Sequence, residues 1–172
     1  MAAGTEAGAQ SLLIYLTIYL VMNVGVFAFV LTMERDGKPV ASIPDLAGLA
    51  TTRPAQALAV AILMFSLAGL PPLVGFFGKF FVFKAAVDAG LAPLAIAGAI
   101  ASVIGAYYYL NIVKVMYLDS PDKPLASNAR IVHTVALGVA AFIMAAGWLP
   151  LPFLQGFGVP EVALAAAQSL MQ

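Results

Sequence analysis

Long apolar runs, separated by short polar connections, set the pattern of this chain. Four runs are long enough, at 1.5 Å per helical residue, to cross the roughly 30 Å apolar core of a bilayer. They cover residues 12–33, 56–89, 91–118 and 131–149. The pattern predicts an all-α, polytopic membrane protein with four transmembrane spans, in which residues 1–172 form a single membrane domain.

The second run is too long for one straight helix. Residues 56–89 would extend about 51 Å, well beyond the apolar core of a bilayer. Pro71 and Pro72 lie inside this run, and proline removes a backbone donor and clashes with the preceding turn. We therefore expect a discontinuous helix, broken at Gly69, Pro71 and Pro72. In lipid such a break is tolerated where it is buried in protein or lines a water-filled cavity, so it should face protein.

The basic residues of the connections fall on one side of the predicted topology. Residues 34–54 and 119–130 hold all of them, namely Arg35, Lys38, Arg53, Lys123 and Arg130. Lysine and arginine mark the inner side of a membrane, so both connections should lie inside and both termini on the outer side. We also expect a short surface helix at residues 42–46, because Pro44 suits a first helical turn.

Composition restricts the class of protein and of cofactor. Hydrophobic residues make up 63% of the chain and the mean hydropathy is +1.01, which is typical of a protein embedded in a lipid bilayer. Basic and acidic residues number 8 each, which argues against a nucleic-acid partner. The absence of cysteine excludes disulfides and cysteine-ligated zinc or iron–sulfur sites, and a single histidine is too few for a metal centre. We therefore expect no cofactor or metal in this chain.

Lys79 is the main candidate for chemistry. It follows the proline pair by two helical turns and shares a helical face with Gly75 and Gly78, whose size lets another helix approach closely. An ammonium within a span costs about 2.5–3.5 kcal/mol on insertion scales, so it indicates a functional site. A lysine that extends to the membrane interface is the alternative, but Lys79 begins some ten residues from the end of the run.

Three other titratable residues have a structural and a functional interpretation. Lys84 precedes Asp88 by four residues, the spacing of an ion pair on a helix surface. Lys114 is expected to extend to the membrane surface beside Tyr117, and His133 to lie at the interface in the first turn of the last span. The alternative for all three is a place in a proton path. The sequence places no carboxylate deep in a span, so Lys79 must find its partner in water, in backbone carbonyls or on another polypeptide segment.

Two stretches carry a resemblance to a known family. SLAGLPPLVGFFGKFFVF (residues 66–83) and SVIGAYYYLNIVKVMYL (residues 102–118) resemble the antiporter-like membrane subunits of proton-pumping NADH:quinone oxidoreductase, respiratory complex I. The first stretch is shared with subunits L and M and with Mrp-type cation/proton antiporters. The YYYL segment favours subunit N, the counterpart of mitochondrial subunit 2. The resemblance covers nearly the whole chain but only the C-terminal third of such a subunit, as would a fragment or the product of a split gene.

The resemblance implies proton translocation coupled to electron transfer from NADH to quinone. Lys79 aligns with the lysine of the family's second broken helix, which implies a proton-accepting role. NADH, FMN, iron–sulfur clusters and quinone would belong to the whole complex. The implied partners are antiporter-like subunit M and small membrane subunits, in an energy-transducing inner membrane such as that of a bacterium. Two alternatives stay open: a subunit of an Mrp-type cation/proton antiporter, and a structural membrane-anchor or assembly subunit.

Overall fold

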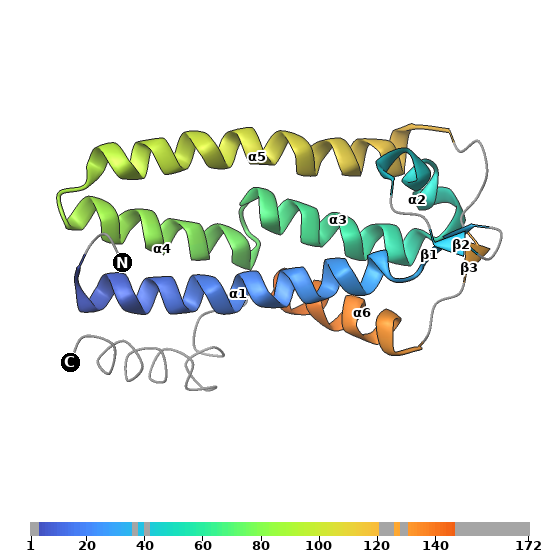
Figure 1. Ribbon diagram of the computed structural model, residues 1–172, viewed down its shortest axis with the longest axis horizontal. Helices are drawn as coiled ribbons and strands as arrows, with labels where there is room; N and C mark the ends of the chain where they lie inside the picture. Colours follow the sequence, from blue (N-terminus) through green and yellow to red (C-terminus); the bar gives the residue numbers. More distant parts are fainter. Residues whose placement is uncertain (1–3, 36–37, 40–41, 121–125, 128–130, 147–172) are drawn as a thin grey trace.

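The computed structural model describes residues 4–35, 38–39, 42–120, 126–127 and 131–146. Six α-helices, a short 3-10 helix and three very short strands form within these residues (Figure 1). The helices are α1 (Glu6–Val30), η1 (Ile43–Leu46), α2 (Leu49–Thr52), α3 (Pro54–Ala68), α4 (Val74–Asp88), α5 (Ala92–Leu118) and α6 (Ile131–Ala146). The strands are β1 (Met33–Arg35), β2 (Lys38–Pro39) and β3 (Ala126–Ser127).

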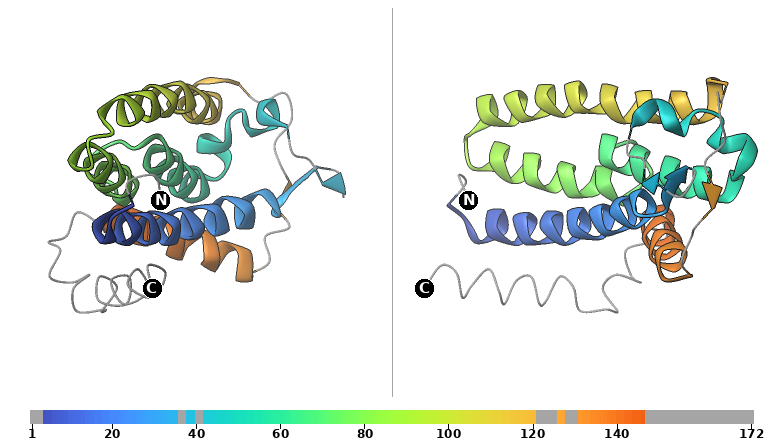
Figure 2. Two further views of the ribbon diagram at one scale, coloured as in Figure 1. Left: turned by 60° about the vertical axis from the view of Figure 1, so that its left-hand side comes forward. Right: turned by 45° about the vertical axis from the view of Figure 1, so that its right-hand side comes forward.

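The long helices pack side by side in alternating directions. Helix α1 runs along the molecule, α3 and α4 follow one another in the return direction, and α5 runs back beside them (Figure 1). The further views keep α4 between α1 and α5, and α6 packs against α1 and α3 (Figure 2). The predicted helical bundle is therefore present among the described residues.

The apolar core lies around α3, where α1, α2, α5 and α6 pack against it. The largest side chains with almost no exposure come from α2, α3, α5 and α6, and are those of Leu49, Leu63, Met116, Met144, Val60 and Ser66. Gly25 of α1 lets the backbones approach, because a Cβ there would lie 2.5 Å from the Cβ of Ala140 and 2.8 Å from Cδ1 of Leu63. Small residues at a helix crossing are the usual means of close packing in a membrane.

The predicted helix break is present. Helix α3 ends at Ala68, α4 begins at Val74, and the residues between them form a turn that contains the proline pair. Pro71 and Pro72 are exposed in the described chain, whereas Val74 and Gly75 are buried. The α4 side of the break therefore packs against the bundle. That the prolines also face protein stays a prediction.

The two helices long and apolar enough to cross a membrane are α1 and α5, among the residues that the structure describes. Helices α3 and α6 are apolar but shorter. The first helix begins at Glu6, six residues before the predicted start, because the Oγ1 of Thr5 accepts a hydrogen bond of 3.1 Å from the backbone N–H of Gly8 and caps the helix. Part of the fourth predicted span, residues 147–149, lies outside the described residues, as does the C-terminal end.

The polar connections contain a small sheet that the hydrophobic pattern did not predict. Strand β1 pairs antiparallel with both β2 and β3, in the order β2-β1-β3. The sheet joins β1 and β2 to β3 and so holds the two connections together at one end of the molecule (Figure 1). Strands this short carry too few alternating residues to be recognised from sequence. The predicted surface helix is confirmed as η1, which has Pro44 in its first turn.

Replacing Gly25 with alanine should destabilise the bundle. The new methyl group would meet Ala140 and Leu63 in a filled core, and overpacking of this kind costs about 1–3 kcal/mol. Thermal unfolding of the purified protein in detergent should show a lower midpoint for Gly25→Ala. Gly138→Ala is the matched control, since nothing lies within 4 Å of a Cβ at Gly138. Equal midpoints for the two variants would contradict the packing assigned to Gly25.

Candidate functional site

The C-terminal end of α3 leaves two backbone carbonyls without partners from its own turn. Gly69 adopts φ +87°, a left-handed conformation that ends the helix. Its N–H donates to the carbonyl of Ser66 at 3.0 Å, and the N–H of Leu70 donates to that of Phe65 at 3.0 Å. This Schellman arrangement satisfies two of the four terminal carbonyls. The carbonyls of Leu67 and Ala68 remain.

Lys79 of α4 binds these two remaining carbonyls. Its Nζ donates to the carbonyl oxygen of Leu67 at 2.8 Å and to that of Ala68 at 3.3 Å. The C-terminal end of a helix carries a partial negative charge, which stabilises a nearby cation. Of the three kinds of partner that the sequence left open, the described residues supply backbone carbonyls. No carboxylate of the described residues forms an ion pair with it.

The lysine side chain has little room beside the break. A Cβ built on Gly69 would lie 3.1 Å from Cδ of Lys79 and 3.4 Å from its Nζ, so the lysine side chain packs directly over this glycine. The left-handed turn therefore has two effects, since it directs the carbonyls of Leu67 and Ala68 toward α4 and leaves space for the lysine that binds them.

A serine that the sequence pattern did not single out joins the two halves of the discontinuous helix. The Oγ of Ser66, in the last turn of α3, accepts a hydrogen bond of 3.0 Å from the backbone N–H of Gly75, in the first turn of α4. Ser66 is fully buried. A Cβ on Gly75 would overlap the carbonyl oxygen of Ser66 and lie 2.7 Å from its Oγ. A serine in an apolar helix usually bonds within its own helix, so the sequence gives no sign of this contact.

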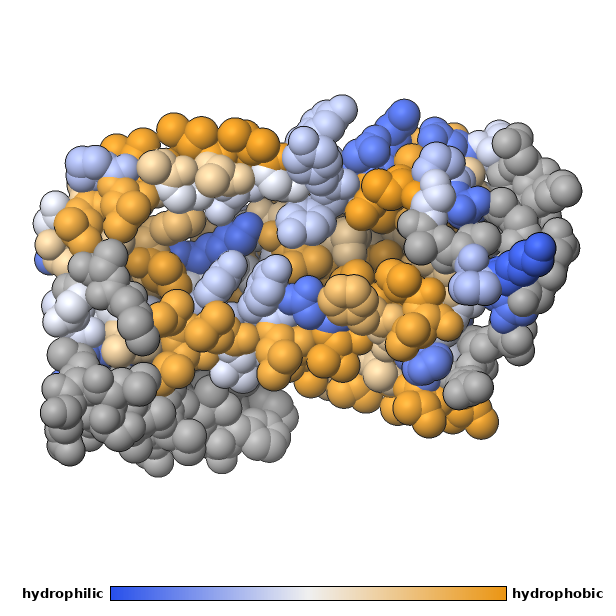
Figure 3. Space-filling view, in the orientation of Figure 1, coloured by the Kyte–Doolittle hydropathy of each residue, from blue (hydrophilic) through white to orange (hydrophobic). Residues whose placement is uncertain are grey.

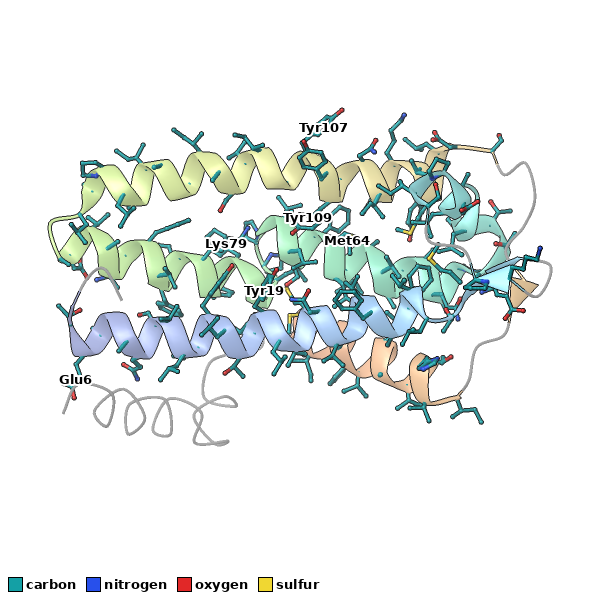
Figure 4. All side chains as sticks on the ribbon, viewed as in Figure 1. Glu6, Tyr19, Met64, Lys79, Tyr107 and Tyr109 are labelled. Carbon is teal, nitrogen blue, oxygen red and sulfur yellow. The ribbon has the colours of Figure 1, made fainter. Side chains whose placement is uncertain are left out.

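Tyrosines from two neighbouring helices lie near the lysine. Tyr15 and Tyr19 of α1 stack with ring centroids 6.0 Å apart, and a Cβ on Gly78 of α4 would lie 3.4 Å from Cδ2 of Tyr15. Tyr19 of α1 and Tyr109 of α5 both lie beside the region of Lys79, toward the middle of the molecule (Figure 4). The space-filling view shows polar side chains along the middle of an otherwise largely apolar face (Figure 3).

The other candidate residues lie apart from this site. Lys84 forms the expected ion pair with Asp88 at 2.6 Å, and both side chains are about three-fifths exposed (58% and 61%). Lys114 lies near the far end of α5, exposed and 3.9 Å from a carboxylate oxygen of Asp119. His133 lies in the first turn of α6, and its Nδ1 is buried with no hydrogen-bond partner among the described residues. The structure therefore does not bring Lys84, Lys114 or His133 together with Lys79.

Comparison with known proteins identifies the family. Residues 1–105, which include α1, the break and Lys79, match the family model described as NADH:quinone oxidoreductase/Mrp antiporter, TM. The chain belongs to this family. It is 50% identical to NADH-quinone oxidoreductase subunit N of Jannaschia sp. (strain CCS1), over 96% of the chain and 35% of that protein. It is 49% identical to the same subunit of Rhodobacter capsulatus, over 99% of the chain and 35% of that protein.

A solved structure has a similar arrangement of helices. Respiratory complex I from Thermus thermophilus with bound aureothin matches with a TM-score of 0.72 and 31% identity, over 88% of this chain and 34% of the matching chain. The resemblance to subunit N of complex I is therefore confirmed. The chain spans about a third of the length of the relatives it matches.

Gly69→Ala should weaken the turn that presents the carbonyls to Lys79. Alanine at φ +87° is strained, which costs about 1 kcal/mol or more, and its Cβ would press on the lysine stem. We expect a lower midpoint of thermal unfolding for the purified protein. Gly69→Asn is the matched variant, because asparagine tolerates this conformation better while its Cβ meets the same lysine atoms. If asparagine and alanine destabilise equally, the left-handed backbone is not the cause.

Proposed function

We propose that this chain forms part of a proton-translocating membrane subunit of NADH:quinone oxidoreductase and that Lys79 accepts and releases the proton. The family match and the relatives named subunit N support the assignment to this complex. The observation that carries the proposal is the contact of the Lys79 ammonium with the free carbonyls of Leu67 and Ala68.

The two protonation states of Lys79 have opposing sources of stability. The charged form is stabilised by two carbonyl dipoles and by the partial negative charge at the C-terminal end of α3. The neutral form avoids the desolvation cost of a charge inside a membrane. A unit charge arriving about 4 Å away changes the balance by about 4 kcal/mol at an effective dielectric constant near 20, roughly a thousandfold in proton affinity. A neighbouring charge is thus sufficient to switch the lysine between its states.

We propose a four-span topology for this chain, with α1, the α3–α4 pair, α5 and α6 as the spans. The length of α1 and α5 supports two of these spans. The break supports the third, because α3 and α4 follow one another in the same direction (Figure 1). The sheet supports a common side for the two basic connections. Because lysine and arginine mark the inner side of a membrane, that side is the inner one, and both termini lie outside.

The redox chemistry is proposed to belong to other subunits. Iron–sulfur clusters need cysteine thiolates and the chain has no cysteine, so the residues present do not fit such a cluster. The described residues contain no group of three or more metal-ligating side chains. We infer that NADH, FMN, the clusters and quinone act elsewhere in the complex, and that the partners are antiporter-like subunit M and small membrane subunits. The location is the energy-transducing membrane of a bacterium.

Two other functions make different predictions. The family model includes Mrp antiporters, which would use the same lysine to exchange a cation for a proton without redox chemistry. Co-purification with NADH-oxidising subunits separates that function from complex I. A structural anchor or assembly subunit would need Lys79 only for packing, and would pump normally after the lysine is replaced by a neutral residue.

Lys79→Ala should lower proton pumping and the coupled reduction of quinone in the assembled complex, by about tenfold or more, since removal of a positioned proton-transfer group typically costs 10²–10⁴-fold in the transfer step. Lys79→Arg should fail as well, because arginine does not release its proton. Both rates are measured in membrane vesicles energised with NADH.

Lys84→Ala is the matched control, a lysine five residues away whose exposed pair with Asp88 contributes at most about 1 kcal/mol. Its pumping should stay close to that of the unmodified complex. Normal assembly with undiminished pumping in Lys79→Ala would falsify the proposed role of this lysine. Equal losses in Lys79→Ala and Lys84→Ala would indicate a general effect of charge on α4.

The topology can be tested by labelling single cysteines, since the chain has none of its own. Gly4→Cys and Ser42→Cys place a thiol near the N-terminus and in the first basic connection, both at exposed positions. An impermeant thiol reagent should label Gly4→Cys from the outer side and Ser42→Cys from the inner side. The reverse pattern would overturn the orientation, and labelling of both from one side would overturn the four-span topology.

A further inference from the structure

Ser66 completes the first turn of α4 from a different helix. The first N–H groups of a helix have no intrahelical partner, and a side chain at the N-cap position usually accepts from one of them. The N-cap residue of α4 is Leu73, which has no side-chain acceptor. The Oγ of Ser66 takes this place, because it accepts at 3.0 Å from the N–H of Gly75. The hydroxyl thus caps α4 while it belongs to α3.

This contact lies directly beside the contacts of Lys79. On α3, Ser66 immediately precedes Leu67 and Ala68, whose carbonyls hold the lysine. On α4, Gly75 precedes Lys79 by four residues and so lies on the same helical face. The two cross-links are therefore one helical turn apart. The inner cross-link is the hydrogen bond between the Gly75 N–H and the Ser66 hydroxyl, and the outer one joins the Lys79 ammonium to the two carbonyls.

The inner cross-link fixes the separation of the two helix ends. A Cβ on Gly75 would overlap the carbonyl oxygen of Ser66, so the helices approach as closely as the backbone allows. The lysine stem packs over Gly69, with its Cδ 3.1 Å from a Cβ built there, so Lys79 reaches the two carbonyls from α4 along the turn. Movement of α4 would therefore change the distances from Nζ to both carbonyls.

We propose that Ser66 is a positioning residue for Lys79, and that its hydroxyl sets the distance between the ammonium and the two free carbonyls of α3. The proposal rests on the proposed function of Lys79 as the proton-transfer group. Ser66 itself transfers no proton. Its hydrogen bond holds the N-terminal end of α4 against the C-terminal end of α3, and this geometry determines how strongly the carbonyls stabilise the protonated lysine.

The test uses the assembled full-length complex in vesicles, with the rate of proton pumping during NADH oxidation measured per amount of assembled complex. Ser66→Ala should assemble and lower pumping about tenfold, because the carbonyls would no longer lie at the distance that stabilises the protonated lysine. Ser66→Thr keeps the hydroxyl and should restore most of the pumping. Ser66→Cys keeps the size of the side chain but offers a weak acceptor, so it should behave like alanine. Ser11→Ala is the matched control, because the Ser11 hydroxyl is exposed and bonds only to the carbonyl of Ala7 in its own helix.

The outcomes separate this proposal from the proposed function. Unchanged pumping in assembled Ser66→Ala or Ser66→Cys, together with a loss in Lys79→Ala, overturns the positioning role and leaves the lysine in place. Undiminished pumping in Lys79→Ala overturns both. If Ser66→Ala does not assemble, the assembled Ser66→Cys variant is the test of the positioning role. Its pumping must fall if the proposal is right, and unchanged pumping overturns it.

A double variant tests whether the serine acts through the lysine. In the Lys79→Ala background, Ser66→Ala should leave the residual rate of NADH–quinone reduction unchanged, because the group that it positions is absent. A further fall in that rate would show general damage to the bundle and overturn the proposal. Threonine that assembles but pumps no better than alanine would also overturn it, since the hydroxyl would then not be the cause.

Discussion

The contact of the Lys79 ammonium with the carbonyls of Leu67 and Ala68 is the interaction on which the rest of this site depends. A helix that ends inside a membrane leaves carbonyls that water cannot reach, and each would cost several kcal/mol if unpaired. A lysine in the same place would carry its own desolvation cost. Each of these two unfavourable features satisfies the other, so the break and the lysine stabilise one another.

Glycine is what allows the two halves of the discontinuous helix to meet in this way. Gly69 supplies the left-handed turn and the space for the lysine stem, and Gly75 lets α4 approach the last turn of α3. Gly78, one residue before Lys79, faces Tyr15 of α1 at van der Waals distance. Lipid offers no hydrophobic driving force between helices, so close approach of this kind is needed to hold them together. The site is therefore closely packed on both its α3 side and its α1 side.

The sequence predicted the parts of the site whose origin is local. The proline pair predicted the break, and Lys79 was identified because a charge is rare inside an apolar run. The ion pair of Lys84 with Asp88 followed from helical spacing. Ser66 could not be found in this way, because its partner is nine residues away across the break and its role depends on how two helices meet. The sheet was missed for a similar reason, since the pairing of β1 with β3 joins residues that are far apart in the chain.

The use of backbone carbonyls in place of a carboxylate has a consequence for proton transfer. A carboxylate beside the lysine would itself titrate, and the pair would exchange protons as a coupled unit. Carbonyls and a helix terminus provide a fixed partial negative charge that does not change with pH. The charge at this site then depends on Lys79 alone, and the described residues bring no second ionised group to it. In the proposed function, the charge that drives a change of protonation would come from another polypeptide segment, as in a proton-transfer step controlled by the rest of a larger assembly.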